Sequence, residues 1–139
     1  MSTGKNTKRY ETPNHPYQGE RIAQEGDLLG RYGLKNKEEL WRTQSELRSY
    51  RREARRLIGE AQGNMEEAEA AGAEFLSRLR RYGILSEDDD INDVLGLDVT
   101  DILEHRLQTV VYRNGLASTP KQARQFIVHE HIVVDQARV

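Results

Sequence analysis

The chain has 139 residues and no cysteine. Without cysteine it can form neither disulfide bonds nor zinc and iron–sulfur sites with thiolate ligands. It also has no apolar run that approaches a membrane span, and its polar start, MSTGKNTKRY, lacks the apolar segment of a signal peptide. These absences predict a cytoplasmic protein that does not contact membranes.

Hydrophobic residues are also scarce. They make up 36% of the chain, against 32% charged residues, so only a small core can form and part of the chain is expected to need a partner. The net charge of −2 hides a division, because residues 1–58 carry thirteen basic and eight acidic residues, whereas residues 59–100 carry three and eleven. The basic surplus predicts a polyanionic partner for the first segment, and the acidic middle segment is predicted to be solvated.

The first 19 residues contain Pro13 and Pro16 and almost no aliphatic side chains. They cannot bury a core, so we predict an extended N-terminal arm over residues 1–19. A disordered tail is one interpretation of this segment. The other is an arm that becomes ordered on nucleic acid, because its basic residues are interleaved with tyrosines.

Two helices are predicted after the arm. Residues 20–34 have the pattern of a short helix that ends in a glycine turn at Gly33. Asn36 can cap a long second helix, in whose first turn two glutamates complement the helix dipole. This long helix is expected to end at Gly59.

The stretch LRSYRREARR in the long helix contains five arginines. At about 100° per residue they fall within one sector of about 140°, and apolar residues such as Leu47 and Leu57 fall on another face. A solvated charged face is the simpler interpretation, but such faces usually mix signs, and Glu53 lies away from the middle of this stripe. We therefore predict phosphate binding, since arginine can grip phosphate oxygens in pairs. The arginines of the stripe are Arg48, Arg51, Arg52, Arg55 and Arg56.

The acidic middle segment completes a helical domain predicted over residues 20–99. Residues 59–72 are expected to form a loop and then a weak helix, and a stronger apolar helical face follows before Gly83. The run SEDDDIND after it could bind a divalent cation, but no calcium-loop pattern surrounds its aspartates. We predict a solvated acidic loop there.

Residues 100–139 have the pattern of a helix, a turn, a second helix and a strand. A start resembling a capping box at Asp101 predicts one helix that ends at Gly115. Thr119 is expected to cap the second helix, with proline at its first position. The segment HIVV, residues 131–134, has the pattern of a strand.

This last segment carries a resemblance to a known family. RLQTVVYRNGLASTPKQARQFIVHEHIVV, residues 106–134, closely resembles the RNA-binding domain named after ribosomal protein four of the small subunit. Upstream, NHPYQGER, GRYGLKNKEELWR, the arginine helix and RRYGILSE resemble the archaeal type of the same family in the same order. The resemblance implies a mainly α fold with a small α+β RNA-binding domain at residues 100–139.

The resemblance also implies a function and partners. The protein would be a structural constituent of the small ribosomal subunit that binds its ribosomal RNA, nucleates assembly of the subunit body and contributes to translational accuracy near the path of incoming messenger RNA. Its protein neighbours would include small-subunit ribosomal protein five, and no cofactor or metal is implied. Matched by position, the RNA-facing candidates are Arg106, Gln108, Thr109, Arg113, Thr119, Lys121, Gln122, Arg124, Gln125, His129 and His131, together with the five arginines of the stripe.

Several alternatives accompany this interpretation. RNA-modifying enzymes can carry the same domain beside a catalytic domain, but this chain shows no glycine-rich cofactor loop and no nucleophile–base pair, which indicates that it is not an enzyme. A helical protein-interaction module could dock its arginine face on an acidic protein. His129 and His131 could ligate a metal, but no third ligand accompanies them. The family's strand normally continues into a hairpin and a tail, so a chain ending in DQARV is expected to hold an incomplete domain.

Overall fold

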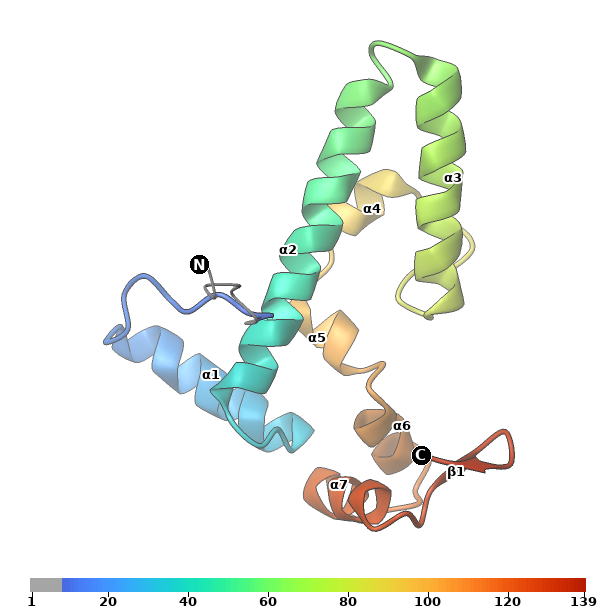
Figure 1. Cartoon of the computed structure of the whole chain (residues 1–139). Coiled ribbons are helices and arrows are strands. Elements are labelled where there is room, and N and C mark those ends of the chain that lie inside the picture. The colour runs from blue at the N-terminus through green and yellow to red at the C-terminus, as the bar shows by residue number, and fades with distance from the viewer. Residues whose placement is uncertain (1–8) are drawn as a thin grey trace, which may run out of the picture.

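The computed structural model describes residues 9–139, and residues 1–8 of the predicted arm lie outside the described part. The fold is mainly helical with one small two-stranded sheet, which confirms the predicted fold class (Figure 1). No helix within the described residues is long and apolar enough to cross a membrane. In chain order the elements are α1 (Gly19–Tyr32), α2 (Lys37–Glu60), α3 (Met65–Arg81), α4 (Ile91–Leu95), α5 (Val99–Leu103), α6 (Leu107–Arg113), α7 (Pro120–Val128), β1 (Val133–Val134) and β2 (Ala137–Arg138).

Helix α2 is the axis of the molecule, with α3 running back along its second half and α1 packed beside its first half (Figure 1). Asn36 caps α2 as predicted, because its side chain accepts the backbone N–H of Glu39 at 3.2 Å. The turn before α2 depends on Gly33, whose φ of +63° lies in the left-handed region that favours glycine. Gly33 therefore ends α1 and turns the chain toward α2.

Residues 9–18 of the predicted arm contain no helix or strand; Tyr10 and Glu11 contact α2, and the chain then loops to the start of α1 (Figure 1). The ring of Tyr10 is centred 5.9 Å from the ring of Trp41. The backbone N–H of Glu11 donates to the hydroxyl of Ser45 at 3.2 Å. These contacts attach the described half of the arm to the helical part of the protein.

The main core lies where α2, α3, α4 and α5 meet. Leu40 and Leu57 of α2 and Leu79 of α3 are fully buried in it, as are Val94 of α4 and Leu103 of α5. Burying a side chain of this size contributes about 2 kcal/mol to stability. Because the apolar residues of α2 recur at helical spacing, they anchor one face of the helix and leave the opposite face to the solvent.

The boundaries around the acidic segment differ from the prediction. Helix α2 continues through Gly59, around which there is open space, and only residues 61–64 separate it from α3. Asn64 caps α3, since its side chain accepts the backbone N–H of Glu67. The predicted loop is therefore confined to residues 61–64, and the helix predicted after it forms as the first turns of α3, which continues without a break to Arg81.

Residues 86–90 of the run SEDDDIND form a largely exposed turn, as predicted, but residues 91–93 already belong to helix α4. The Asp89 carboxylate accepts the backbone N–H of Ser86 at 2.9 Å. Asp90 caps α4 by accepting from the backbone of Asp93, whose own carboxylate accepts the backbone N–H of Asp90 at 2.8 Å. These short acidic side chains hold a turn and a helix start, where the helix dipole favours negative charge.

The helix predicted to start at Asp101 is in fact two helices. The capping box forms one turn earlier, where the Asp101 carboxylate accepts the backbone N–H of Asp98 at 2.8 Å. The chain leaves the helical conformation at Arg106, whose ψ is 145°. At this break the carbonyl of Leu103 accepts the hydroxyl of Thr109 at 2.8 Å. The apolar periodicity continues across the break, so it gave no sign of it.

A second, smaller core lies among α6, α7 and the hairpin of β1 and β2, with Val111, Ala117, Ala123 and Ile132 buried. The two strands pair antiparallel over two residues each. A core of this size supplies little stability by itself, so this end relies on contacts with the helical part. The domain boundary predicted after residue 99 stays a prediction, although α5 packs into the main core.

Candidate nucleic-acid interface

The five arginines of the stripe have different environments. Arg52 and Arg55 are exposed, and within residues 9–139 neither forms an ion pair or a hydrogen bond with a side chain. Arg51 is half-buried at the edge of the packed face, where it donates to the backbone carbonyl of Leu97. Arg51 therefore joins α2 to the segment before α5, and the open part of the stripe centres on Arg52 and Arg55.

The two ends of the stripe are paired with carboxylates. Arg48 lies 3.6 Å from the Glu11 carboxylate of the arm and donates to the Ser45 hydroxyl at 2.8 Å. Arg56 pairs with both Glu53 and Glu60. The hydrogen bond from Arg56 holds the pKa of the Glu53 carboxyl below its usual value. Glu53, which lies away from the middle of the stripe, therefore neutralises the arginine at its end.

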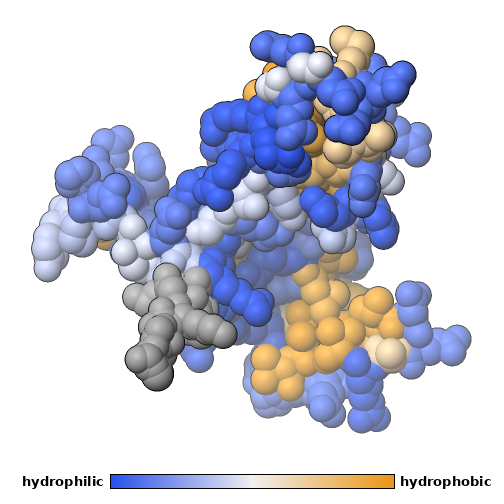
Figure 2. Space-filling model, turned by 45° about the horizontal axis from the view of Figure 1, so that its top comes forward, coloured by the Kyte–Doolittle hydropathy of each residue, from blue (hydrophilic) through white to orange (hydrophobic). Residues whose placement is uncertain are grey.

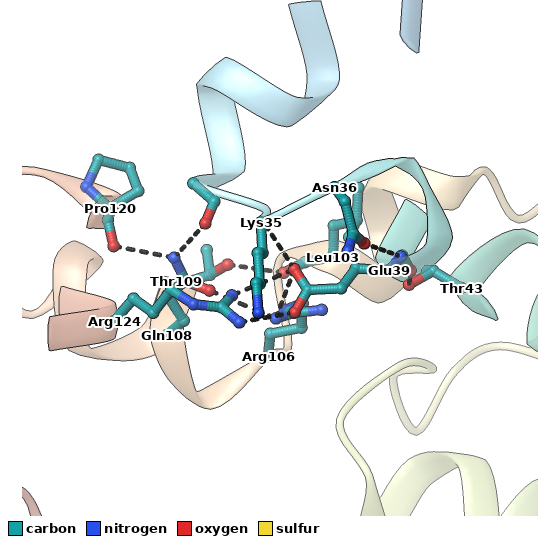
Figure 3. A network of polar contacts seen from close by, with 11 residues as sticks. Lys35, Asn36, Glu39, Thr43, Leu103, Arg106, Gln108, Thr109, Pro120 and Arg124 are labelled. Carbon is teal, nitrogen blue, oxygen red and sulfur yellow. Dashed lines mark hydrogen bonds and ion pairs between the residues drawn. The ribbon is translucent and has the colours of Figure 1, made fainter. Parts of the chain in front are cut away.

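Two predicted RNA-facing residues of the C-terminal segment are buried. Gln108 is 4% exposed and Thr109 is 3% exposed. The Gln108 amide nitrogen donates to the carbonyl of Gly33 at 2.8 Å and to that of Pro120 at 2.9 Å (Figure 3). Gln108 thus ties the turn after α1 to the start of α7, and its side chain is not presented to a ligand.

Glu39 of α2 holds two further candidates (Figure 3). Its carboxylate accepts two hydrogen bonds from Arg124, at 2.8 and 3.1 Å, and lies 3.9 Å from Arg106. It also accepts the backbone N–H of Lys35 at 2.7 Å. Burial acts to raise the pKa of the Glu39 carboxyl, but the hydrogen bonds from Arg124 and Lys35 outweigh burial and the pKa lies below its usual value.

Like Glu39, Glu104 links a residue of the main core to the C-terminal helices. Its carboxylate accepts a hydrogen bond from Arg113 at 3.0 Å and another from the Tyr32 hydroxyl at 2.8 Å. The hydrogen bond from Arg113 lowers the pKa of the Glu104 carboxyl despite partial burial. Burial raises the pKa of the Tyr32 hydroxyl, and the hydrogen bond to Glu104 raises it further. Arg113 is thus partly neutralised within the protein.

The remaining candidates lie on and after α7. Thr119 caps the helix as predicted by accepting the backbone N–H of Gln122 at 3.0 Å, and the Gln122 side chain accepts the N–H of Ser118. Lys121 and Gln125 are exposed on the outer side of the helix. After the helix, His129 and His131 are both exposed, and their rings are centred 6.5 Å apart. No group of three or more possible metal ligands exists among the described residues.

This end of the molecule also exposes apolar side chains. Leu116 is 61% exposed and Val128 is 68% exposed, and most of the hairpin valines are similarly open. Figure 2 shows hydrophobic surface gathered at one end of the molecule and hydrophilic surface over most of the rest. The C-terminal surface is therefore mixed, with a few cations and imidazoles beside apolar patches.

Sequence reasoning missed the residue that organises this region, Glu39. Its place in the first turn of α2 was attributed to the helix dipole. Its partner Arg124 lies 85 residues away in sequence, and no local pattern identifies such a pair. A single carboxylate facing two arginines could have been found only by placing α7 beside α2.

Comparison with known proteins finds relatives that match this chain over its whole length. The S4 domain family matches residues 105–139. Small ribosomal subunit protein uS4 of Haloquadratum walsbyi is 86% identical over 139 residues, which are all of this chain and 79% of that protein. The uS4 protein of Natronomonas pharaonis is 70% identical over the same residues and 80% of its own length, and that of Methanococcus aeolicus is 53% identical over 96% of this chain and 74% of its own. The resemblance inferred from the sequence is thereby confirmed, and the chain belongs to the small ribosomal subunit protein uS4 family, of archaeal type.

Proposed function

We propose that this protein is a structural constituent of the small ribosomal subunit that binds small-subunit ribosomal RNA through two surfaces. As a member of the uS4 family it is a ribosomal protein of the cytoplasm and not an enzyme. The arginine surface consists of Arg48, Arg52 and Arg55 on α2. The C-terminal surface consists of Lys121, Gln125, His129 and His131.

One observation carries the proposal most strongly. Arg52 and Arg55 are exposed, and within residues 9–139 they are unpaired, on a helix whose opposite face is fixed in the main core. Arginines held together without a counter-ion repel one another, and phosphate oxygens remove that repulsion. Because the helix fixes the backbone of both residues, the order lost on binding is that of the arginine side chains themselves.

The other candidates have a different role in this proposal. Their side chains hold the surfaces in place through bonds within the protein, and contact with RNA is secondary for them. Recognition then depends on phosphate positions and RNA shape more than on base edges. These positioning residues are Arg51, Arg56, Arg106, Gln108, Thr109, Arg113, Thr119, Gln122 and Arg124.

We further propose the finer roles that the family resemblance implies. The protein would enter the subunit early, nucleate assembly of its body, lie beside small-subunit protein five and support translational accuracy near the path of incoming messenger RNA. The support for these roles is the resemblance over nearly the whole chain. Reconstitution of subunits with this protein omitted tests them, since loss of later proteins, protein five among them, is expected.

The RNA-binding proposal is tested by the salt dependence of affinity for purified small-subunit ribosomal RNA. Each neutralised phosphate adds roughly 0.7–0.9 to the slope of log affinity against log salt. The double variant R52Q/R55Q should bind more weakly and lower the slope by about 1.5. The matched control R31Q/R42Q removes the same charge from arginines that pair with Asp27 and Glu38, and should change the slope less.

The same experiment separates RNA from an acidic protein as the partner of the arginine surface. If the slope is flat, or if the two double variants are indistinguishable, phosphate binding by Arg52 and Arg55 is wrong. Nuclease treatment of native subunits should release the protein. Retention on other subunit proteins after complete RNA digestion would favour a protein-interaction module instead.

A further inference from the structure

A groove of about 340 Å³ lies between α2, the turn that follows α3 and the break between α5 and α6. None of the functional candidates except Arg106 contributes to it. Its walls combine two aromatic rings, two aliphatic side chains, one carboxylate and one guanidinium. The lining residues are Glu46, Tyr82, Ile84, Ile102, His105 and Arg106.

The imidazole of His105 is fixed in this groove along two edges. Its Nδ1 lies 2.7 Å from the carbonyl of Asp101, and since a carbonyl only accepts, Nδ1 carries the proton and donates. Its other edge packs against Gly83, where a Cβ atom would lie 3.1 Å from the ring. The absent side chain at Gly83 therefore makes room for the Cδ2–Nε2 edge of the ring, which is held as one wall of the groove.

Tyr82 stands beside this ring and is unusually open for a tyrosine. Its side chain is 53% exposed, and within residues 9–139 it forms no ring contact or hydrogen bond that would occupy it. Ile102 is 7% exposed and, with the half-buried Ile84, supplies an apolar floor. An exposed aromatic ring above an apolar floor can stack on a flat ring system of a ligand.

The polar groups of the groove define the edge of such a ligand. One carboxylate oxygen of Glu46 accepts the Tyr50 hydroxyl at 2.6 Å, and the second is open within the described part of the chain. An ionised carboxylate only accepts hydrogen bonds, so the open oxygen pairs with donor groups of a ligand and not with its acceptor atoms. Arg106 also lines the groove, but its guanidinium is held within the protein, bonded to the Gln108 side chain at 3.3 Å and 3.9 Å from Glu39.

We propose that this groove binds one unstacked nucleobase of the ribosomal RNA, a guanine. The base stacks on Tyr82, and its N1–H and N2–H groups donate to the Glu46 carboxylate. Among the four bases guanine alone presents an imino and an amino N–H side by side on its Watson–Crick edge, which matches a carboxylate acceptor. The inference rests on the proposed RNA-binding function and adds a base-reading site to it.

The first test uses the variant Y82L and purified small-subunit ribosomal RNA. Loss of one stacked base should lower affinity about 10-fold. The slope of log affinity against log salt should stay unchanged, because no cation is removed. The matched control is Y82F, which keeps the aromatic ring and should bind like the wild type. A Y82L protein that binds like the wild type, or one whose slope falls, overturns the inference.

The second test uses short single strands as probes, UUUGUUU against UUUUUUU. Wild-type protein should bind the guanine-containing strand several-fold more tightly, and E46Q should lose that preference while still folding, because Glu46 is exposed. Equal affinity of the wild type for both strands overturns the inference. If instead the wild type shows no salt-dependent affinity for ribosomal RNA at all, the proposed function fails first, so the two failures can be told apart.

Discussion

Glu39 and Arg124 face each other across the junction of the two cores, joined by two hydrogen bonds of 2.8 and 3.1 Å. Such a paired geometry is the strongest that arginine makes with a carboxylate. Because Arg124 lies on α7 and Glu39 at the start of α2, the pair fixes the C-terminal segment relative to the helical part. The stability of the protein and its sensitivity to acid should therefore both depend on this pair.

The variant E39Q should be less stable than the wild type by about 2 kcal/mol, because a half-buried arginine loses its charged acceptor. Urea unfolding measures the difference. The neighbouring Glu38 is the matched control, since its exposed carboxylate lies 3.9 Å from Arg42, and E38Q should change stability by less than about 0.5 kcal/mol. Equal effects of the two variants would show that the junction does not depend on Glu39.

Acid should weaken the same junction. The pKa values of Glu39 and Glu104 lie below the ordinary value of 4.5 in the folded protein, so the unfolded chain takes up protons first as pH falls. Their stabilisation is therefore present above about pH 4.5 and is lost as pH falls through the folded pKa values. The free energy of unfolding between pH 6.5 and 3 should decline less steeply in E39Q/E104Q. An unchanged decline would assign acid sensitivity to other carboxylates.

The packing of α7 against α1 also depends on Gly33. A Cβ atom there would lie 2.6 Å from the Gln108 amide nitrogen and 2.8 Å from Pro120, at a φ that disfavours side chains. G33A should therefore cost at least about 2 kcal/mol and separate α7 from α1. The control G30A adds the same methyl group in open space within α1 and should be neutral or stabilising. Thermal unfolding of both proteins decides the matter.

Arg51 and Arg52 are adjacent, but replacing Arg51 should affect stability, whereas replacing Arg52 should affect RNA binding. Arg51 bonds to the Leu97 carbonyl, so R51Q should lower the free energy of unfolding by about 1 kcal/mol and leave the salt slope of RNA binding close to that of the wild type. R52Q should leave stability unchanged and lower the slope by about 0.8. If both variants reduced the slope equally, the arginine surface would have to include Arg51.

Local signals account for the parts of the fold that were predicted well. The cap at Asn36, the turn at Gly33 and the cap at Thr119 each depend on neighbouring backbone atoms, which sequence displays directly. The break at Arg106 was missed because the apolar pattern continues across it, and the hydrogen bond from Thr109 to the Leu103 carbonyl that spans the break leaves no sign in that pattern. The helix start within the acidic run was missed because composition does not distinguish solvated aspartates from helix caps.

In the candidate site, too, features set by neighbouring residues were predicted and those set by distant contacts were not. Helical periodicity predicted the face on which Arg52 and Arg55 lie, and these are exposed. It also placed Arg51 on that face, although Arg51 is half-buried and bonds to the Leu97 carbonyl. At the edge of a stripe, the exposure of a side chain depends on which segment packs there, and helical periodicity does not contain that information. Gln108 and Arg124 came from family resemblance, which marks positions that matter without saying whether they face RNA or the protein interior.

The most direct measurement is RNA–protein crosslinking in the native small subunit, mapped to single residues. We expect crosslinks to ribosomal RNA at two clusters, one around Arg52 and Arg55 and one from Lys121 to His131. Far fewer are expected at the buried Gln108 and Thr109. Crosslinks absent from both clusters, or confined to the acidic segment of residues 59–100, would contradict the claim that these surfaces hold the RNA.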